Sequence, residues 1–179
     1  MYGAPPPPAL KKGMATWVIV LLCLAGALPI AGGVFASLAI YGVRKYIATA
    51  KTAEARNALG QIGKDVASVY ERDHALCPSA SSPVPVSMRA LRGLKYQSAA
   101  ADWAVDRAQN AGFACLRFAM SAPQYYQYSY ARSGSGQFTA TAHGDLNGDG
   151  KVSTFILRGA VTGGVLTIAP SLEETDPEE

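Results

Sequence analysis

The first third of the chain carries two hydrophobic patterns in succession. Residues 13–43 contain no charged side chain, and residues 17–41 are almost wholly Leu, Ile, Val, Ala, Gly and Phe. About 20 apolar residues cross a bilayer core at 1.5 Å per residue. We therefore predict a transmembrane helix over residues 14–43, since the apolar region of a signal peptide is shorter, about 7 to 15 residues.

After residue 43 the apolar positions take helical spacing. Apolar or small residues recur close to the i, i+3, i+4, i+7 template, at Val43, Ile47, Ala50, Ala55, Leu59, Ile62, Val66 and Val69. The pattern predicts that the same helix continues as an amphipathic half over residues 44–72. Pro29 is the position where we expect this helix to kink or loosen within the bilayer.

The second half of the chain changes to strand patterns. Residues 73–112 include a Ser- and Pro-rich loop and predict a helix-to-sheet connection. Short runs of aromatic and β-branched residues then predict antiparallel strands within residues 113–170, at 113–120, 125–132, 137–142, 152–158 and 165–169. The expected fold class is α+β, with the long N-terminal helix packed on a small antiparallel β-sheet. Residues 171–179 are acidic and predict a disordered tail.

Alternation places three tyrosines on one face of a predicted strand. Tyr126, Tyr128 and Tyr130 are separated by Gln127 and Ser129, and strand side chains alternate between two faces. An aromatic stripe of this kind favours packing in the core over a ligand or partner surface.

Cysteine usage indicates the compartment. Cys23 lies inside the predicted span, whereas Cys77 and Cys115 lie in the soluble part. A bridge between Cys77 and Cys115 would stabilise a small domain in an oxidising compartment; the alternative is two buried thiols. The bridge favours a single-pass inner-membrane protein with a periplasmic C-terminal domain and residues 1–13 as a Pro-rich cytoplasmic tail or leader. Basic residues flank both sides of the span, so charge alone does not decide the orientation.

One acidic turn matches the start of an EF-hand calcium loop. Asp145, Asn147 and Asp149 supply oxygens at positions one, three and five, and Ser153 falls at position nine. Position twelve holds Ile156 in place of the usual bidentate Glu, so the loop alone is under-coordinated. The two interpretations are a calcium site formed by these residues and a plain Gly- and Asn-containing turn between strands.

Composition and motifs narrow the function classes. The net charge is only +3 and the 16 Lys and Arg residues are scattered, which argues against a nucleic-acid partner. His74 lies near Cys77 and His143 near Asp145, but the sequence has no phosphate loop, zinc spacing or nucleophile elbow. We therefore expect no enzymatic activity and no small-molecule substrate.

Several segments resemble type IV pilins and type II secretion pseudopilins. Segment 38–62 is similar to the membrane-exit half of their N-terminal helix, and its sequence is LAIYGVRKYIATAKTAEARNALGQI. Segments 123–130 (PQYYQYSY), 144–150 (GDLNGDG) and 153–155 (STF) also resemble a pilin-like subgroup. The resemblance covers roughly residues 11–160. It implies a protruding helix packed against a sheet, subunits that assemble through their helices, and calcium in a loop between strands.

The N-terminus departs from the family pattern. Lys11, Lys12 and Gly13 followed by Met14 resemble a prepilin cleavage site, with processing between Gly13 and Met14. The family's glutamate, four residues after the first mature residue, is here Val18. A membrane carboxylate of this kind is thought to guide pairing between subunits, so its absence removes an electrostatic guide.

Spacing is the second departure. More residues separate Gly13 from the segment that resembles the family's helix than in the family itself, and Gly42 stands where the family has its proline. This favours an uncleaved anchor. Two functions remain open: a pilin-like structural subunit of a type IV pilus or type II secretion-type filament, with lipid and other pilin-like subunits as partners, or a non-polymerising membrane-tethered periplasmic binding or calcium-sensing module.

Overall fold

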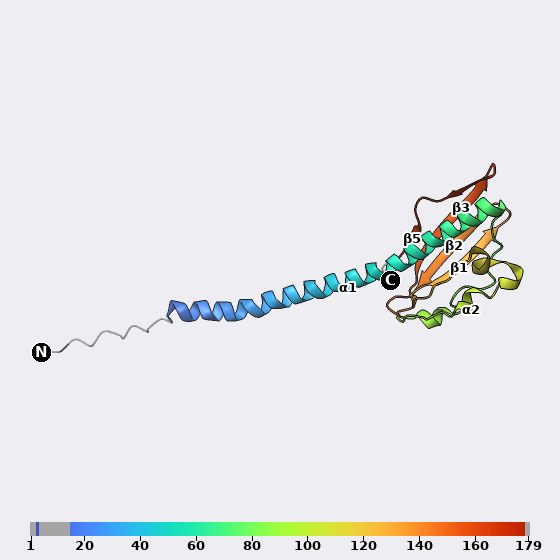
Figure 1. Ribbon diagram of the computed structural model, residues 1–179. Helices are drawn as coiled ribbons and strands as arrows, with labels where there is room; N and C mark the ends of the chain where they lie inside the picture. The colour runs from blue at the N-terminus through green and yellow to red at the C-terminus, as the bar shows by residue number, and fades with distance from the viewer. Residues whose placement is uncertain (1–2, 4–14, 178–179) are drawn as a thin grey trace. The chain divides into compact units, whose positions relative to one another are not determined.

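The computed structural model describes residue 3 and residues 15–177 (Figure 1). The Pro-rich tail and the candidate cleavage site at Gly13 and Met14 lie outside the described residues. The chain divides into two compact units, Met1–Arg44 and Lys45–Glu179, and each is considered by itself.

A single helix, α1, runs from Thr16 to Asp73 and contributes to both units. Within the described residues, this confirms the prediction that one helix continues from the apolar segment through residue 72. Pro29 lies inside α1, which continues through it. One helix near the N-terminus is therefore long and apolar enough to cross a membrane.

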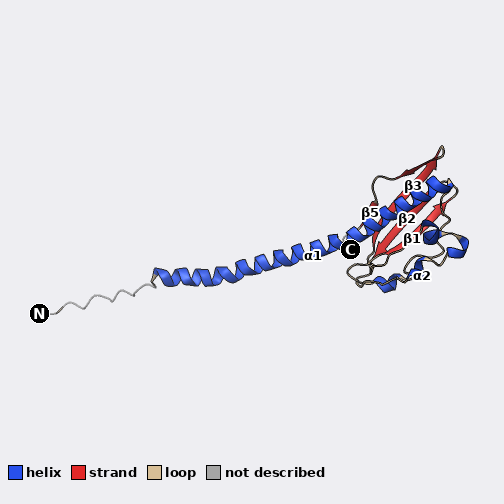
Figure 2. Ribbon diagram, in the orientation of Figure 1, coloured by secondary structure: helices blue, strands red, loops and turns tan. Residues whose placement is uncertain are grey.

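The second unit contains an antiparallel sheet in the order β1-β2-β3-β4. Its strands are drawn in red in Figure 2. Its path follows the chain from one strand to the next, with bounds of β1 Gln127–Ser133, β2 Gln137–Gly144, β3 Ser153–Thr162 and β4 Val165–Ile168. Gly163 and Gly164 connect β3 to β4 with φ angles of 60° and 79°. A two-residue hairpin turn with positive φ at both positions matches the strand twist, and glycine adopts it without steric cost.

Two predictions from the sequence are wrong. Residues 113–120 were expected to form a strand, but α3 spans Gly112–Leu116. Helical spacing lets Phe113 and Leu116 both enter the core, and Cys115 is held by a disulfide. The other short elements of this connection are η1 Met88–Leu91, α2 Ala100–Trp103 and η2 Arg107–Gln109.

The acidic end is the second correction. Residues 171–179 were predicted to be disordered, but β5 spans Glu173–Thr175 and pairs with β3. Arg158 and Arg56 donate to the carboxylates of Glu173 and Glu174, with nitrogen–oxygen distances of 2.8 Å in both pairs. These ion pairs hold side chains whose mutual repulsion had suggested disorder.

The core of the second unit lies between α1 and one face of the sheet (Figure 1). The helix contributes one buried stripe, formed by Ala55, Ala58, Leu59, Ile62, Val66 and Val69. Tyr126, Tyr128 and Tyr130 are at most 1% exposed, which confirms that the tyrosine stripe is core. Phe138 and Phe155 pack beside them on β2 and β3.

Candidate functional site

The first unit offers an apolar helical surface. Its large side chains from Trp17 to Val43 include many that are half exposed or more, such as Phe35 at 72% and Ile30 at 70%. No residue in its most apolar 18-residue window is buried by the described part of the chain. A helix that is apolar on every side requires lipid or other helices around it.

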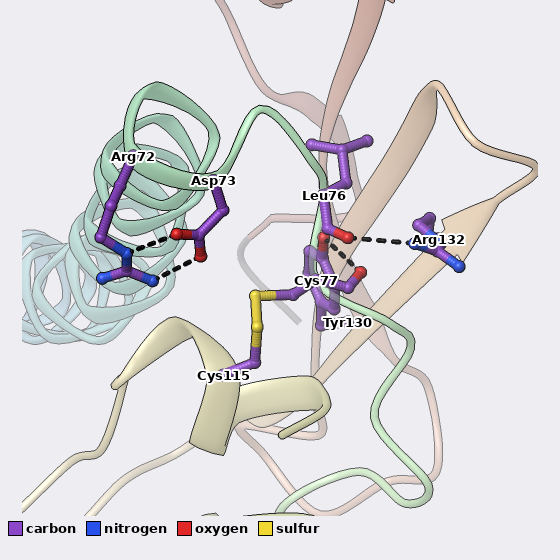
Figure 3. Close-up of a disulfide and its surroundings, with 7 residues drawn as sticks. All are labelled: Arg72, Asp73, Leu76, Cys77, Cys115, Tyr130 and Arg132. Atoms are coloured by element: carbon purple, nitrogen blue, oxygen red, sulfur yellow. Dashed lines mark hydrogen bonds and ion pairs between the residues drawn. A yellow bond between two sulfur atoms is a disulfide. The ribbon is translucent and has the colours of Figure 1, made fainter. Parts of the chain in front are cut away.

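A disulfide fixes the point where α1 gives way to the sheet connection (Figure 3). Cys77 and Cys115 are bonded across 38 positions of sequence, which confirms the predicted bridge. The Tyr130 hydroxyl donates to the Cys77 carbonyl at 3.3 Å, and Arg132 donates to the Leu76 carbonyl at 3.1 Å. The bridge thus holds the end of α1 near β1 and α3.

Glu54 connects α1 to the sheet with a half-buried carboxylate. Its Oε1 accepts hydrogen bonds from the Tyr125 N–H at 2.8 Å and from the Tyr128 hydroxyl at 3.2 Å. Burial raises the pKa of Glu54, while the bonds from Tyr125 and Tyr128 act in the opposite direction. Burial also raises the pKa of Tyr128, and the neighbouring Glu54 adds to that rise.

Two lysines lie against the same aromatic ring. Lys51 on α1 and Lys95 from the connection each place Nζ 4.8 Å from the centroid of Tyr125. Lys51 Nζ also donates to the Leu146 carbonyl at 3.0 Å, so α1 contacts the turn between β2 and β3. Cation–π contacts of this kind are favourable by about 0.5–1 kcal/mol at exposed sites.

The candidate calcium loop is the turn between β2 and β3. Asp145 is buried, and its carboxylate accepts from the Gly148 N–H at 2.7 Å and the Gly150 N–H at 3.1 Å. Asn147 Oδ1 and Asp149 Oδ1 accept from the N–H groups two residues ahead of each. These bonds are those of an Asx-type turn.

Ser153, the fourth candidate ligand, is the first residue of β3. Its side chain is fully buried, and its hydroxyl lies within hydrogen-bonding distance of the Gly144 carbonyl at 3.3 Å and the Tyr126 hydroxyl at 3.4 Å. Within residues 15–177, no group of three or more His, Cys, Asp and Glu side chains is placed to hold a metal. Calcium binding at Asp145, Asn147 and Asp149 stays a prediction.

The two histidines have separate surroundings. His143 Nδ1 lies 3.0 Å from the Thr154 hydroxyl on the adjacent strand, and burial lowers the pKa of His143. His74 follows the end of α1, where its ring meets the edge of Tyr70. Because the Cys77 sulfur is bonded to Cys115, it offers no thiol nucleophile to His74.

Two shallow apolar grooves follow the exposed side of α1. One of about 330 Å³ lies beside Gly60 and Gly63, with Leu157 and Ile168 in its floor. The other, of about 360 Å³, is lined by Tyr70 and residues of β4. The sequence pattern did not indicate these grooves, because their linings combine α1 with residues of β3 and β4 that lie far along the chain.

Sequence reasoning also missed the network of Glu54, Lys51 and Lys95. Glu54 lies one residue before the buried Ala55, and a carboxylate beside a buried stripe is a signal that could have been noticed. Its partners come from 70 or more residues downstream, so no local pattern identifies them.

Comparisons with known proteins leave the chain without an assigned relative. No family model matches the sequence. Searches of curated proteins and of solved structures also found no significant match.

Proposed function

We propose that this chain is a pilin-like structural subunit of a type IV pilus or type II secretion-type filament, anchored in the inner membrane. The observation that carries the proposal is α1, an unbroken helix from Thr16 to Asp73. Its first part is apolar and exposed, and its last part forms one side of the core of a small α+β unit.

The exposed first part supports assembly through helices. Side chains such as Leu22, Phe35 and Tyr41 are 62%, 72% and 66% exposed. In a membrane, lipid can cover such a surface, and in a filament the helices of neighbouring subunits can cover it instead. The same helix surface can therefore contact lipid before assembly and neighbouring helices in the filament.

The disulfide of the second unit supports the proposal that this unit lies outside the cytoplasm. Its fold is closed by the Cys77–Cys115 disulfide, which forms and persists in oxidising compartments. Such a bridge favours a periplasmic location for this unit and a cytoplasmic N-terminus. The resemblance of segments 38–62 and 123–130 to pilin-like proteins adds to the proposal.

Crosslinking between neighbouring spans tests assembly. The native Cys23 lies on the exposed part of α1. In a Cys23→Ala background, single cysteines introduced at Leu22 or Phe35 should yield dimers on mild oxidation of cells, and sheared surface fractions should contain the chain. A cysteine introduced at Ser68 in the second unit is the matched control. Monomers alone at every span position, with no chain in the sheared fraction, would contradict the proposal.

A second candidate is a membrane-tethered module that never polymerises. Val18 favours it, because pilin-like proteins carry a glutamate at this position that is thought to guide subunit pairing. The candidate calcium loop would give such a module a ligand. Thermal unfolding in excess calcium and in chelator tests this ligand: a Tm that rises with calcium and loses that rise in Asp149→Ala assigns calcium to the loop, and an unchanged Tm contradicts a calcium-sensing module.

A further inference from the structure

The second unit carries basic side chains near Tyr125 and the β2–β3 turn that the proposed function does not use. We name the basic patch as Lys51, Arg92, Lys95 and Lys151. We propose that this patch docks on the anionic phospholipid headgroups of the membrane that holds α1. The inference rests on the proposed membrane anchoring and adds a binding surface to it.

Contacts within the second unit bring the four residues together. Lys51 and Lys95 share the ring of Tyr125, with Nζ to centroid distances of 4.8 Å. Arg92 Nε lies 3.8 Å from Asp145 Oδ2, next to the Leu146 carbonyl that Lys51 binds. Lys151 ends the same β2–β3 turn. Three cations from two separate segments, α1 and the connection, therefore gather near the turn that carries Lys151.

Arg92, Lys95 and Lys151 are exposed, and the nearby carboxylates of Asp145 and Glu54 are at least partly buried. The Arg92 side chain is 63% exposed, whereas that of Asp145 is 3% exposed. Asp145 and Glu54 direct their oxygens to backbone N–H groups and to the Tyr128 hydroxyl. Asp149 is exposed and offsets one positive charge. The charge that a flat anionic surface would meet is therefore positive.

Apolar side chains lie within the patch. Leu94, between Arg92 and Lys95 in the chain, is 66% exposed, and Val152, next to Lys151, is 38% exposed. Basic residues mixed with exposed apolar ones are typical of surfaces that bind the interface of an anionic bilayer, where apolar groups enter the headgroup layer. A nucleic-acid backbone offers no apolar surface for the exposed Leu94 side chain to contact.

Only a short stretch of sequence connects the patch to the predicted span. Lys51 follows the last apolar residue of the span, Val43, by only eight positions of α1. Tethering at this distance makes docking an intramolecular event with a high effective concentration of lipid. Each basic residue near an anionic surface strengthens membrane binding about fivefold, so four weak contacts together favour the docked state.

The test uses the full chain in lipid nanodiscs. A bimane label on Leu94→Cys, in a Cys23→Ala background, reports contact with quencher-bearing lipids. We expect stronger quenching in discs of phosphatidylcholine with phosphatidylglycerol than in phosphatidylcholine alone, and loss of the difference at high salt, which screens charge. Lys95→Glu with Lys151→Glu should reduce the ratio of docked to undocked chain by at least about 25-fold.

Controls separate a lost patch from a damaged fold. Lys64→Glu with Arg107→Glu changes the same number of exposed charges elsewhere on the unit and should leave quenching unchanged. Lys95→Gln with Lys151→Gln should give an intermediate loss, and the Tm of each variant reports on folding.

Four outcomes overturn the proposal. Equal quenching in the two lipid mixtures, or full quenching in the folded Lys95→Glu and Lys151→Glu variant, excludes the patch as a headgroup site while leaving anchoring intact. Quenching that disappears when several chains share a disc assigns the patch to a second copy. A chain recovered outside the discs contradicts the anchoring itself.

Discussion

The two parts of α1 belong to one helix but are stabilised in different ways. In the second unit, residues such as Leu59 and Ile62 are fully buried against the sheet. In the first unit, Leu38 and Phe35 are 60% and 72% exposed. The second part gains its stability from tertiary packing on its own chain. The first part has no such support among the described residues, so its surroundings must supply it.

This difference teaches where the chain needs partners. An apolar stripe on one face is satisfied by a single sheet, whereas an apolar surface on all faces is satisfied only by lipid or by several other helices. The experiments below test whether the two parts of α1 respond independently, starting with the largest expected effect.

Removal of the disulfide should affect the second unit alone. Cys77→Ala with Cys115→Ala opens a loop across 38 positions and should lower the free energy of unfolding of this unit by about 4 kcal/mol, because the unfolded chain gains freedom. Urea unfolding in detergent, followed by near-UV circular dichroism, measures this. The helical signal of the span should persist. Cys23→Ala is the matched control, and an unchanged unfolding midpoint in the double variant would contradict the role of the bridge.

Leucine truncation compares the two parts of α1 directly. Leu59→Ala removes a fully buried side chain and should destabilise the second unit by about 3 kcal/mol. Leu38→Ala, at 60% exposure, should change the stability of that unit by less than about 0.5 kcal/mol. The measurement is the same urea titration. Equal effects of the two variants would show that the two parts of α1 unfold as one.

Glu54 should make the second unit sensitive to pH. Burial raises the folded-state pKa of Glu54 above its usual value of 4.5. The folded state then holds a proton that the unfolded state releases, so this group's contribution to stability falls as pH rises from 4.5 through the folded pKa. Glu54→Gln should flatten that part of the profile. Chemical denaturation in steps of about one pH unit from pH 4 to 8 compares the free energy of unfolding of the two proteins.

Truncation of Glu54 distinguishes its hydrogen bonds from its charge. Glu54→Ala leaves the Tyr125 N–H and the Tyr128 hydroxyl without this acceptor and should cost about 2 kcal/mol at every pH. If Glu54→Gln and Glu54→Ala gave the same stability at neutral pH, the bonds to Tyr125 and Tyr128 would contribute nothing.

The smallest effect is expected at the surface pair of Arg56 and Glu174. Glu174→Gln should lower the stability of the second unit by less than about 1 kcal/mol, because both side chains are partly solvated. Arg56 lowers the pKa of Glu174, so this contribution is present above the usual carboxylate pKa and is lost as pH falls through the lowered value. Added salt should weaken it. A loss as large as that of Leu59→Ala would mean that β5 is required for the core.

Parts of this fold could be predicted from the sequence because they depend on local repeats. The span, the amphipathic continuation to residue 72 and the strands around the tyrosines follow from periodicities of 3.6 and 2. The run at 113–120 has aromatic and apolar residues that suit a strand as well as a short helix. The structure forms a helix over part of it, and in that helix Cys115 is bonded to Cys77. Its own residues therefore did not decide its structure.

The candidate sites divide in the same way. The pairing of Cys77 with Cys115 could be predicted because two soluble cysteines in one small domain have few alternatives. The basic patch could not, since Lys51, Arg92 and Lys95 come from distant segments and meet only around Tyr125 and the β2–β3 turn. The calcium interpretation of Asp145, Asn147, Asp149 and Ser153, which rests on EF-hand spacing, stays a prediction.

The sequence by itself determined that α1 is long and changes from uniformly apolar to one-sided, because the hydrophobic effect acts on each residue according to its own chemistry. Tertiary structure alone decided which charges gather near Tyr125 and the β2–β3 turn and that the acidic end pairs as β5. The physical reason is range. Periodicity depends on residues that are close in the sequence, whereas hydrogen bonds, ion pairs and cation–π contacts depend on positions that only the folded chain brings together.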